Sequence, residues 1–182
     1  MVATQTRQAT PWRLTGRWRK ATLLVHMMSA LGWLGADVVL LILAVTGLTS
    51  DDRSTVAACY QAMGLFVVPT LLTAGLLCLA TGVLLGLSSR YGLLKYWWVA
   101  TKLAINLVLT SLVLVLLQPR VDEAARLGRG VVTGLDLGVL GTTLRAQLIA
   151  PPIVSITALT FAAVLAVYKP WGRLRRGNGR RD

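Results

Sequence analysis

The stretch ATLLVHMMSALGWLGADVVLLILAVTGL, residues 21–48, decides the fold class of this 182-residue chain. It exceeds the ~20 residues that an α-helix needs to cross ~30 Å of hydrocarbon. Further apolar stretches cover residues 62–87, 94–117 and 148–168. Only helices and closed barrels satisfy every backbone polar group in lipid, and these stretches lack the period-two alternation of barrel strands. The sequence therefore predicts an all-α integral membrane four-helix bundle, with residues 1–182 forming a single transmembrane domain.

The composition agrees with a membrane protein. Hydrophobic residues make up 55% of the chain and charged residues 14%, and the mean hydropathy is +0.65, outside the usual balance of a soluble domain. The net charge of +12 is concentrated on the flanks of the apolar stretches, where it would meet the anionic headgroups of the lipid bilayer. This distribution argues against nucleic acid as a partner.

Lysine and arginine also predict the orientation, because cytoplasmic flanks are enriched in them. Thirteen of the 19 fall in the tails, residues 1–20 and 169–182, and in the second interhelical segment. Five fall in the first and third segments, and Lys102 lies inside a span. We therefore expect a multi-pass protein of the bacterial inner membrane with both termini cytoplasmic.

The third interhelical segment, residues 119–147, is predicted to be an external loop. Gly130, Gly134 and Gly138 recur every four residues in it, which suits either a helix on the outer membrane surface or an irregular loop. Alternatively, the last helix begins before Arg145. We favour a break at Pro151 and Pro152, since proline suits a first helical turn.

Two features of the second span are predicted to be architectural. Pro69 should kink the helix by removing a backbone bond, with Thr70 and Thr73 close enough to satisfy freed carbonyls. Gly82 and Gly86 form a small-xxx-small step that would let another helix approach closely.

The polar residues inside the spans are the candidates for function, because each is costly in lipid unless it is paired or hydrated. In the first span these residues are His26, Ser29, Trp33 and Asp37. Their offsets of 0, 3, 7 and 11 residues place them on one helical face. In the third span a similar stripe recurs every four residues. The two stripes would form a buried polar seam of Ser29, Trp33, Asp37, Trp98, Asn106 and Thr110, flanked by His26 and Lys102.

Lys102 and Asp37 each leave alternatives open. The lysine could pair near Asn106, reach toward Asp37 if the helices slide by a turn, or extend its ammonium group to the headgroups. A carboxylate in the membrane must be paired, hydrated or protonated, so Asp37 is a candidate for function. His26 and Asp37 lie about 16 Å apart along the helix and cannot touch directly.

His26 is the single histidine of the chain. Imidazole can ligate haem or metal and can carry protons near neutral pH, but a histidine at this depth also serves as a hydrogen-bonded packing residue. No group of residues has the spacing of a metal site, and the motifs of soluble enzymes are absent. The sequence therefore favours a role other than catalysis.

The run HMMSALGWLG, residues 26–35, resembles the first-helix pattern of several related bacterial membrane families. These are the copper-resistance protein D family, the bacterial membrane protoporphyrinogen oxidase and an uncharacterised group of predicted integral membrane proteins. Trp98 and Lys102 resemble the W-x-x-x-K pattern of a later helix, and the run Tyr168, Lys169, Pro170 resembles the ending of the uncharacterised group, which is the nearest of the three. The resemblance implies that His26 is the candidate haem or metal ligand and Lys102 the partner of a bound acidic group.

Three functional hypotheses follow. The first is a structural or accessory membrane component, acting as a homo-oligomer or within a larger membrane complex. The second is a membrane redox protein that binds haem or metal through His26. The third is a proton- or ion-coupled carrier, which four spans without inverted repeats support less well.

Overall fold

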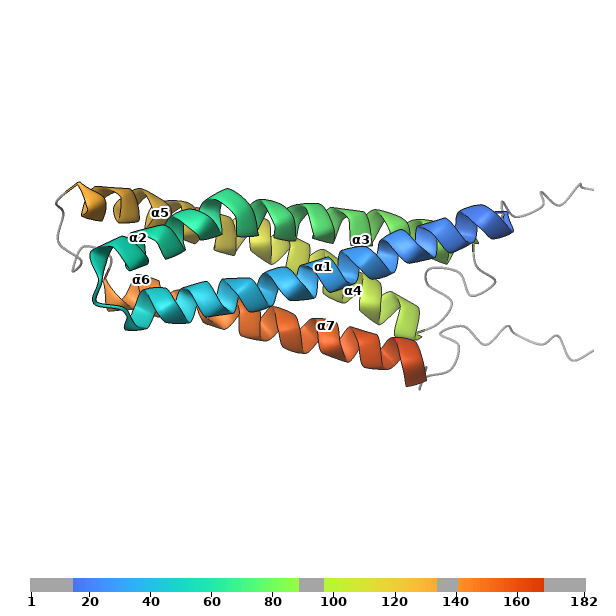
Figure 1. The fold of residues 1–182 in the computed structure, drawn as a ribbon. Helices are drawn as coiled ribbons and strands as arrows, with labels where there is room; N and C mark the ends of the chain where they lie inside the picture. Colours follow the sequence, from blue (N-terminus) through green and yellow to red (C-terminus); the bar gives the residue numbers. More distant parts are fainter. Residues whose placement is uncertain (1–14, 89–96, 134–140, 169–182) are drawn as a thin grey trace, which may run out of the picture.

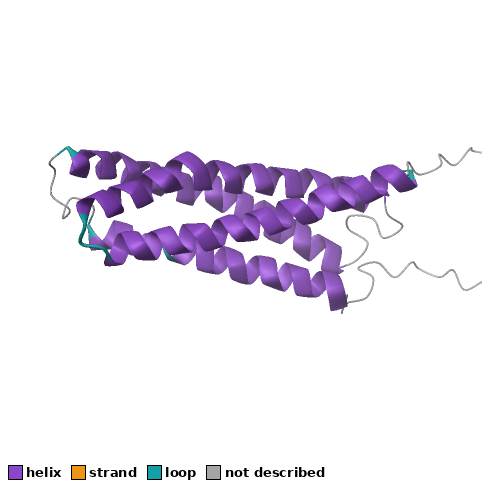
Figure 2. Cartoon of the chain, in the orientation of Figure 1, coloured by secondary structure: helices purple, strands orange, loops and turns teal. Residues whose placement is uncertain are grey.

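The computed structural model describes residues 15–88, 97–133 and 141–168. In these residues the chain is all-α, as predicted, and it contains four helices long and apolar enough to cross a membrane. In Figure 2 nearly all of the described residues are helical, with short loop segments such as the turn between α1 and α2. The length and composition of these helices are those of a multi-pass membrane protein.

The first helix, α1, covers Gly16–Thr49, and the turn after it leads into the second long helix. That helix consists of α2 (Arg53–Ala62), a π-helical segment η1 (Met63–Val67) and α3 (Val68–Ser88). Asp52 caps α2: its carboxylate accepts the backbone N–H of Thr55 at 2.9 Å and the hydroxyls of Ser54 and Thr55 at 2.6 Å each. The cap satisfies one of the backbone N–H donors that the first turn of a helix leaves unpaired.

The third long helix repeats this plan. It consists of α4 (Trp97–Leu112), a second π-helical segment η2 (Val113–Leu117) and α5 (Gln118–Val132). A short helix α6 (Thr142–Gln147) then precedes α7 (Ala150–Tyr168). Two i→i+3 bonds, from Leu148 to Arg145 and from Ile149 to Ala146, separate α6 from α7. Pro151 and Pro152 therefore occupy the first turn of α7, at the expected break.

The four long helices form an antiparallel bundle in which α1 and α4 each pack against both α3 and α7. In Figure 1 the start of α1, the end of α3, the start of α4 and the end of α7 lie at one end of the bundle. At the other end α2 packs against α5 and against α1. The core residues Val121 and Ala124 of α5 are fully buried there.

The structure corrects the predicted loop at residues 119–147. Residues 118–132 continue the third helix as α5 and residues 142–147 form α6, so most of this segment is helical. Gly130 lies within α5, whereas Gly134 and Gly138 fall outside the described residues. The second helix likewise begins at Arg53, earlier than the predicted start at residue 62. The cationic segments 1–14, 89–96 and 169–182 are outside the described residues, so the orientation stays a prediction.

The cause of the wrong loop prediction is the way this chain accommodates proline inside a helix. Each π-helical segment ends two residues before a proline, at Pro69 and at Pro119. A proline ring clashes with the carbonyl four residues earlier, and those carbonyls belong to Leu65 and Val115, inside η1 and η2. The wider i→i+5 turn lets the helix continue past the ring. Thr70 and Thr73, expected to satisfy the carbonyls freed by Pro69, instead bond to the carbonyls of Phe66 and Pro69.

Candidate functional site

The polar and aromatic face predicted on α1 is turned toward the bundle. His26 is half-buried, and Ser29, Trp33 and Asp37 are buried. Ser29 donates its hydroxyl to the carbonyl of Val25 on the same helix at 2.8 Å. The interactions that reach other helices therefore come from the remaining three residues.

His26 connects α1 to α3. Its Nδ1 lies 3.1 Å from the carbonyl oxygen of Cys78 and 3.0 Å from the hydroxyl of Thr81. A carbonyl can only accept, so Nδ1 carries the proton in this contact. The close approach depends on Gly82, where an added Cβ would lie 3.3 Å from Cε1 of His26. The predicted small-residue step thus admits the imidazole ring against α3.

Trp33 and Thr110 converge on a second glycine of α3. A Cβ added at Gly75 would lie 2.8 Å from Cζ3 of Trp33 and 3.0 Å from the hydroxyl oxygen of Thr110. The indole Nε1, the Thr110 hydroxyl and the side-chain oxygen of Asn106 are buried without a hydrogen-bond partner among the described residues. These three groups of the predicted seam therefore give the bundle centre unused hydrogen-bonding capacity.

Lys102 packs against Trp98, one turn earlier on α4. Its Nζ lies 4.8 Å from the centroid of the indole ring, within the range of a cation–π interaction. Both side chains are half-buried. The structure does not join Lys102 to Asp37, a pairing that the sequence left open.

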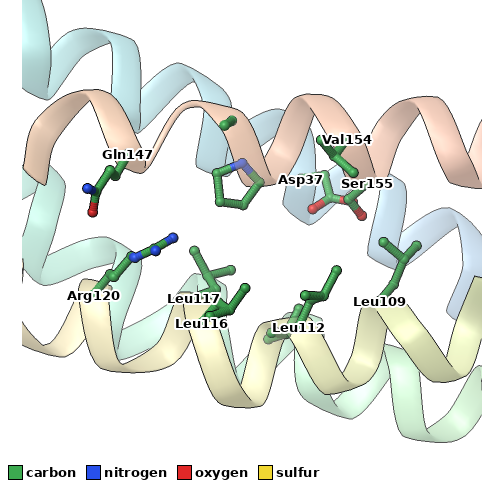
Figure 3. A pocket seen from close by; sticks show the side chains of 12 residues that line it. Asp37, Leu109, Leu112, Leu116, Leu117, Arg120, Gln147, Val154 and Ser155 are labelled. Carbon is green, nitrogen blue, oxygen red and sulfur yellow. The ribbon is translucent and has the colours of Figure 1, made fainter. Parts of the chain in front are cut away.

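Asp37 instead pairs with Ser155 of α7, a residue that the sequence analysis missed. The Ser155 hydroxyl donates to Oδ2 of Asp37 at 2.5 Å, and the two residues are 2% and 6% exposed. The pair borders a cavity of about 260 Å³ between α7 and the third helix. Figure 3 shows the two side chains meeting at the wall of this space. A carboxyl group with a hydroxyl partner at a cavity wall can hold a proton or form a hydrogen bond to a bound molecule.

The remaining cavity wall is almost wholly apolar. On the third helix it is formed by Leu109, Leu112, Val113, Leu116 and Leu117, and on α7 by Ala150, Pro151 and Val154. Arg120 of α5 and Gln147 of α6 line the opposite end from Asp37. In Figure 3 the side chain of Arg120 extends across the space toward α7. The cavity is therefore an apolar channel with polar groups at its two ends.

Three of the four polar cavity residues escaped the sequence analysis for identifiable reasons. Ser155 is a single serine in an apolar helix, without a periodic stripe to mark it. Arg120 and Gln147 lie in the segment taken for a loop, so neither had a helical face to be assigned to. The pairing of helix faces is a property of the tertiary structure. The sequence pattern of α7 therefore does not predict which helix Ser155 faces.

A metal site has no support in the part of the chain that the structure describes, which holds no group of three or more His, Cys, Asp or Glu side chains placed to bind an ion. Comparisons with protein-family models, with curated proteins and with solved structures find no match to the chain. The function of the protein is therefore inferred from the geometry of the bundle.

Proposed function

We propose that this protein is an accessory component of the bacterial inner membrane that holds a lipid-soluble ligand in the cavity beside Asp37. Both termini lie in the cytoplasm, as the distribution of lysine and arginine indicates. The observation that carries the proposal is the buried Asp37–Ser155 pair at the wall of an apolar cavity. Burying a carboxyl group in the membrane costs several kcal/mol unless the group is paired or hydrated. One hydroxyl partner offsets only part of this cost, so a purely structural role explains Asp37 poorly.

The cavity opens toward the surrounding lipid. Leu112 of the third helix and Val154 of α7 line it and are 37% and 55% exposed. Such exposed apolar side chains on both walls would face acyl chains in a bilayer. A hydrophobic molecule could then enter from the side without passing through water.

A lipid-soluble carbodiimide tests whether Asp37 is reached from the lipid. Dicyclohexylcarbodiimide couples to protonated carboxyl groups in apolar surroundings, and peptide mass spectrometry locates the adduct. We expect an adduct on Asp37 that is lost in Asp37→Asn. Val154→Trp, which fills the cavity, should slow the reaction, whereas Val164→Trp on the same helix should not, because Val164 is exposed away from the cavity wall.

Two results would contradict the proposal. One is labelling confined to the exposed carboxylates, such as Asp52 and Asp122, in a folded protein. The other is labelling of Asp37 at the same rate in both tryptophan variants, which would mean that the reagent does not arrive through the cavity.

A second candidate, haem-dependent redox chemistry at His26, is favoured by one contact. Because Nδ1 donates to the carbonyl of Cys78, Nε2 is the lone-pair nitrogen of the neutral ring, which is the usual arrangement of a metal-bound histidine. His26 would therefore be the residue that holds a haem iron, and the resemblance noted in the sequence would assign Lys102 to an acidic group of the haem. Haem would supply electron transfer there.

An absorption spectrum decides this candidate. The protein purified in mild detergent would be measured air-oxidised and then dithionite-reduced, beside total metal analysis. A Soret band that shifts on reduction and disappears in His26→Ala would support haem ligation. A colourless, metal-free protein would reject the candidate and leave the first proposal standing.

A further inference from the structure

We propose that the ligand of the cavity is an anionic phospholipid, with its phosphate on Arg120 and Gln147 and one acyl chain running toward the Asp37–Ser155 pair. This inference rests on the proposed function, because it names the class of molecule that enters the cavity. It is carried by Arg120, by the shape of the apolar channel and by the side from which the channel opens.

Arg120 stands apart from the other arginines of α5. Arg126 forms an ion pair with Glu123 at 2.8 Å, and Arg129 is exposed. Arg120 is half-buried and lines the cavity, and within the described residues its guanidinium makes neither an ion pair nor a hydrogen bond. A cation turned into an apolar channel favours an anionic partner.

The chemistry of the two residues at this end suits a phosphate. A guanidinium group can bind two phosphate oxygens at once through its parallel N–H donors. The amide of Gln147 offers further donors beside it.

The position of Arg120 along the helix also suits a headgroup. It lies three residues after Leu117, the last residue of η2, close to where the third helix would leave the hydrocarbon. Ser155 lies eight residues after Gln147, about 12 Å further along the bundle if the rise is that of an α-helix. A headgroup at Arg120 therefore places its acyl chain in the channel with the Asp37–Ser155 pair at the deep end.

The walls and the opening distinguish a lipid from a free anion. The cavity of about 260 Å³ lies below the range of about 300–1,000 Å³ that is common for ligand sites, so it can take part of one flexible acyl chain and is too small for a bulky ring system. The exposure of Leu112, Leu116 and Val154 leaves the channel open to the surrounding bilayer. The second acyl chain can then stay in the membrane against the outer faces of the same helices.

The sequence contains an independent indication. The third interhelical segment carries four arginines on the side where the positive-inside distribution leaves few cations. One of these arginines, Arg126, forms an ion pair within α5. The positive-inside rule does not account for Arg120 on this side of the membrane, whereas binding of an anionic lipid would.

Lipid retention by purified protein tests the inference. The protein in neutral detergent would be incubated with dioleoyl-phosphatidylglycerol or dioleoyl-phosphatidylcholine, passed over a sizing column and analysed for bound lipid. We expect preferential retention of phosphatidylglycerol, and about tenfold or greater weakening in Arg120→Ala, as the loss of a charge-assisted hydrogen bond predicts. Arg129→Ala is the matched control, since it removes the same charge from the same helix, and it should retain the lipid normally.

The outcomes separate this inference from the proposed function. Equal retention of both lipids that Val154→Trp abolishes and Val164→Trp preserves would overturn the anionic headgroup and keep a lipid-soluble ligand. Equal losses in Arg120→Ala and Arg129→Ala would show general surface attraction and overturn the site. Displacement of phosphatidylglycerol by inorganic phosphate at equal concentration would identify a free anion as the ligand. Both proposals would be overturned if the protein retained neither lipid and if the carbodiimide labelled Asp37 at the same rate in Val154→Trp and Val164→Trp.

Discussion

At the residue scale, the two titratable residues on the buried face of α1 have separate neutral partners. His26 meets Thr81 and the Cys78 carbonyl of α3, and Asp37 meets Ser155 of α7. Helical periodicity within the first span was sufficient to predict that His26 and Asp37 lie on one face of the helix. It also predicted that they are too far apart along the helix to touch. It could not supply the partners, because the hydroxyl that each residue meets depends on which helices pack together.

One residue outside the apolar core carries a pH prediction. The three donors around the Asp52 carboxylate, first the Ser54 hydroxyl and then Thr55, hold the pKa of Asp52 well below its ordinary value of 3.8. A lowered pKa means that the folded protein favours the charged form, so the stabilisation is complete above pH 3.8 and declines as the pH falls from there toward the lowered value. We expect Asp52→Ala to lower the unfolding temperature in detergent at pH 7.

The comparison that checks it is the difference in unfolding temperature between the wild type and Asp52→Ala, measured at pH 7 and at several values below pH 4. The difference should shrink across the acidic series. Asp51→Ala removes the adjacent carboxylate, which caps no helix, and should behave like the wild type at pH 7. A constant difference at every pH would show that charge plays no part in the cap.

At the element scale, the apolar runs of the sequence were sufficient to predict four long helices. The positions at which these helices begin and end could not be predicted from hydropathy. The second helix reaches Arg53 and the third extends to Val132, well into sequence of mixed polarity. These extensions are stabilised by each other, since α2 and α5 pack together. A prediction based on single segments treats Pro119 as a stop because it cannot anticipate the wide turn before it.

Glycine contacts between elements give a second prediction. Gly75→Ala would place a methyl group 2.8 Å from the Trp33 ring and 3.0 Å from Thr110, and such overpacking typically costs about 1–3 kcal/mol. We expect a lower unfolding temperature for this variant. Gly35→Ala, on an exposed position with nothing within 4 Å of the added Cβ, should leave the temperature unchanged or raise it slightly. Equal stabilities for the two variants would mean that Trp33 and Thr110 can move away without cost.

At the scale of the whole molecule, an even number of antiparallel crossings places both ends of the described bundle on one side. The start of α1 and the end of α7 lie at the same end of the bundle in Figure 1. The sequence predicted this arrangement from the count of apolar stretches, and it added the orientation from lysine and arginine. The cavity was beyond sequence reasoning, because three separate helices and the short α6 contribute to it.

Reporter fusions test the orientation. A reporter at Asp182 should read as cytoplasmic, and one inserted after Thr133, at the opposite end of the bundle, should read as periplasmic. Exchanging the basic residues 173–181 for neutral ones should weaken this bias without changing the number of crossings. A periplasmic signal from Asp182 would overturn the topology.

The two π-helical turns next to Pro69 and Pro119 also bear on how the sequence can evolve by insertion and deletion of residues. A π-helical turn accommodates one residue more than an α-turn, so η1 and η2 are places where a single codon can be gained within a membrane helix. Deleting one residue from α4 instead, outside the wide turn, would rotate the remainder of the third helix by about 100°. Val121 and Ala124, now fully buried, would turn outward, and neighbouring charged positions such as Asp122 would turn inward. A related chain that lacked Pro119 could lose the extra residue together with it, and the paired change would leave the same face of α5 against α2.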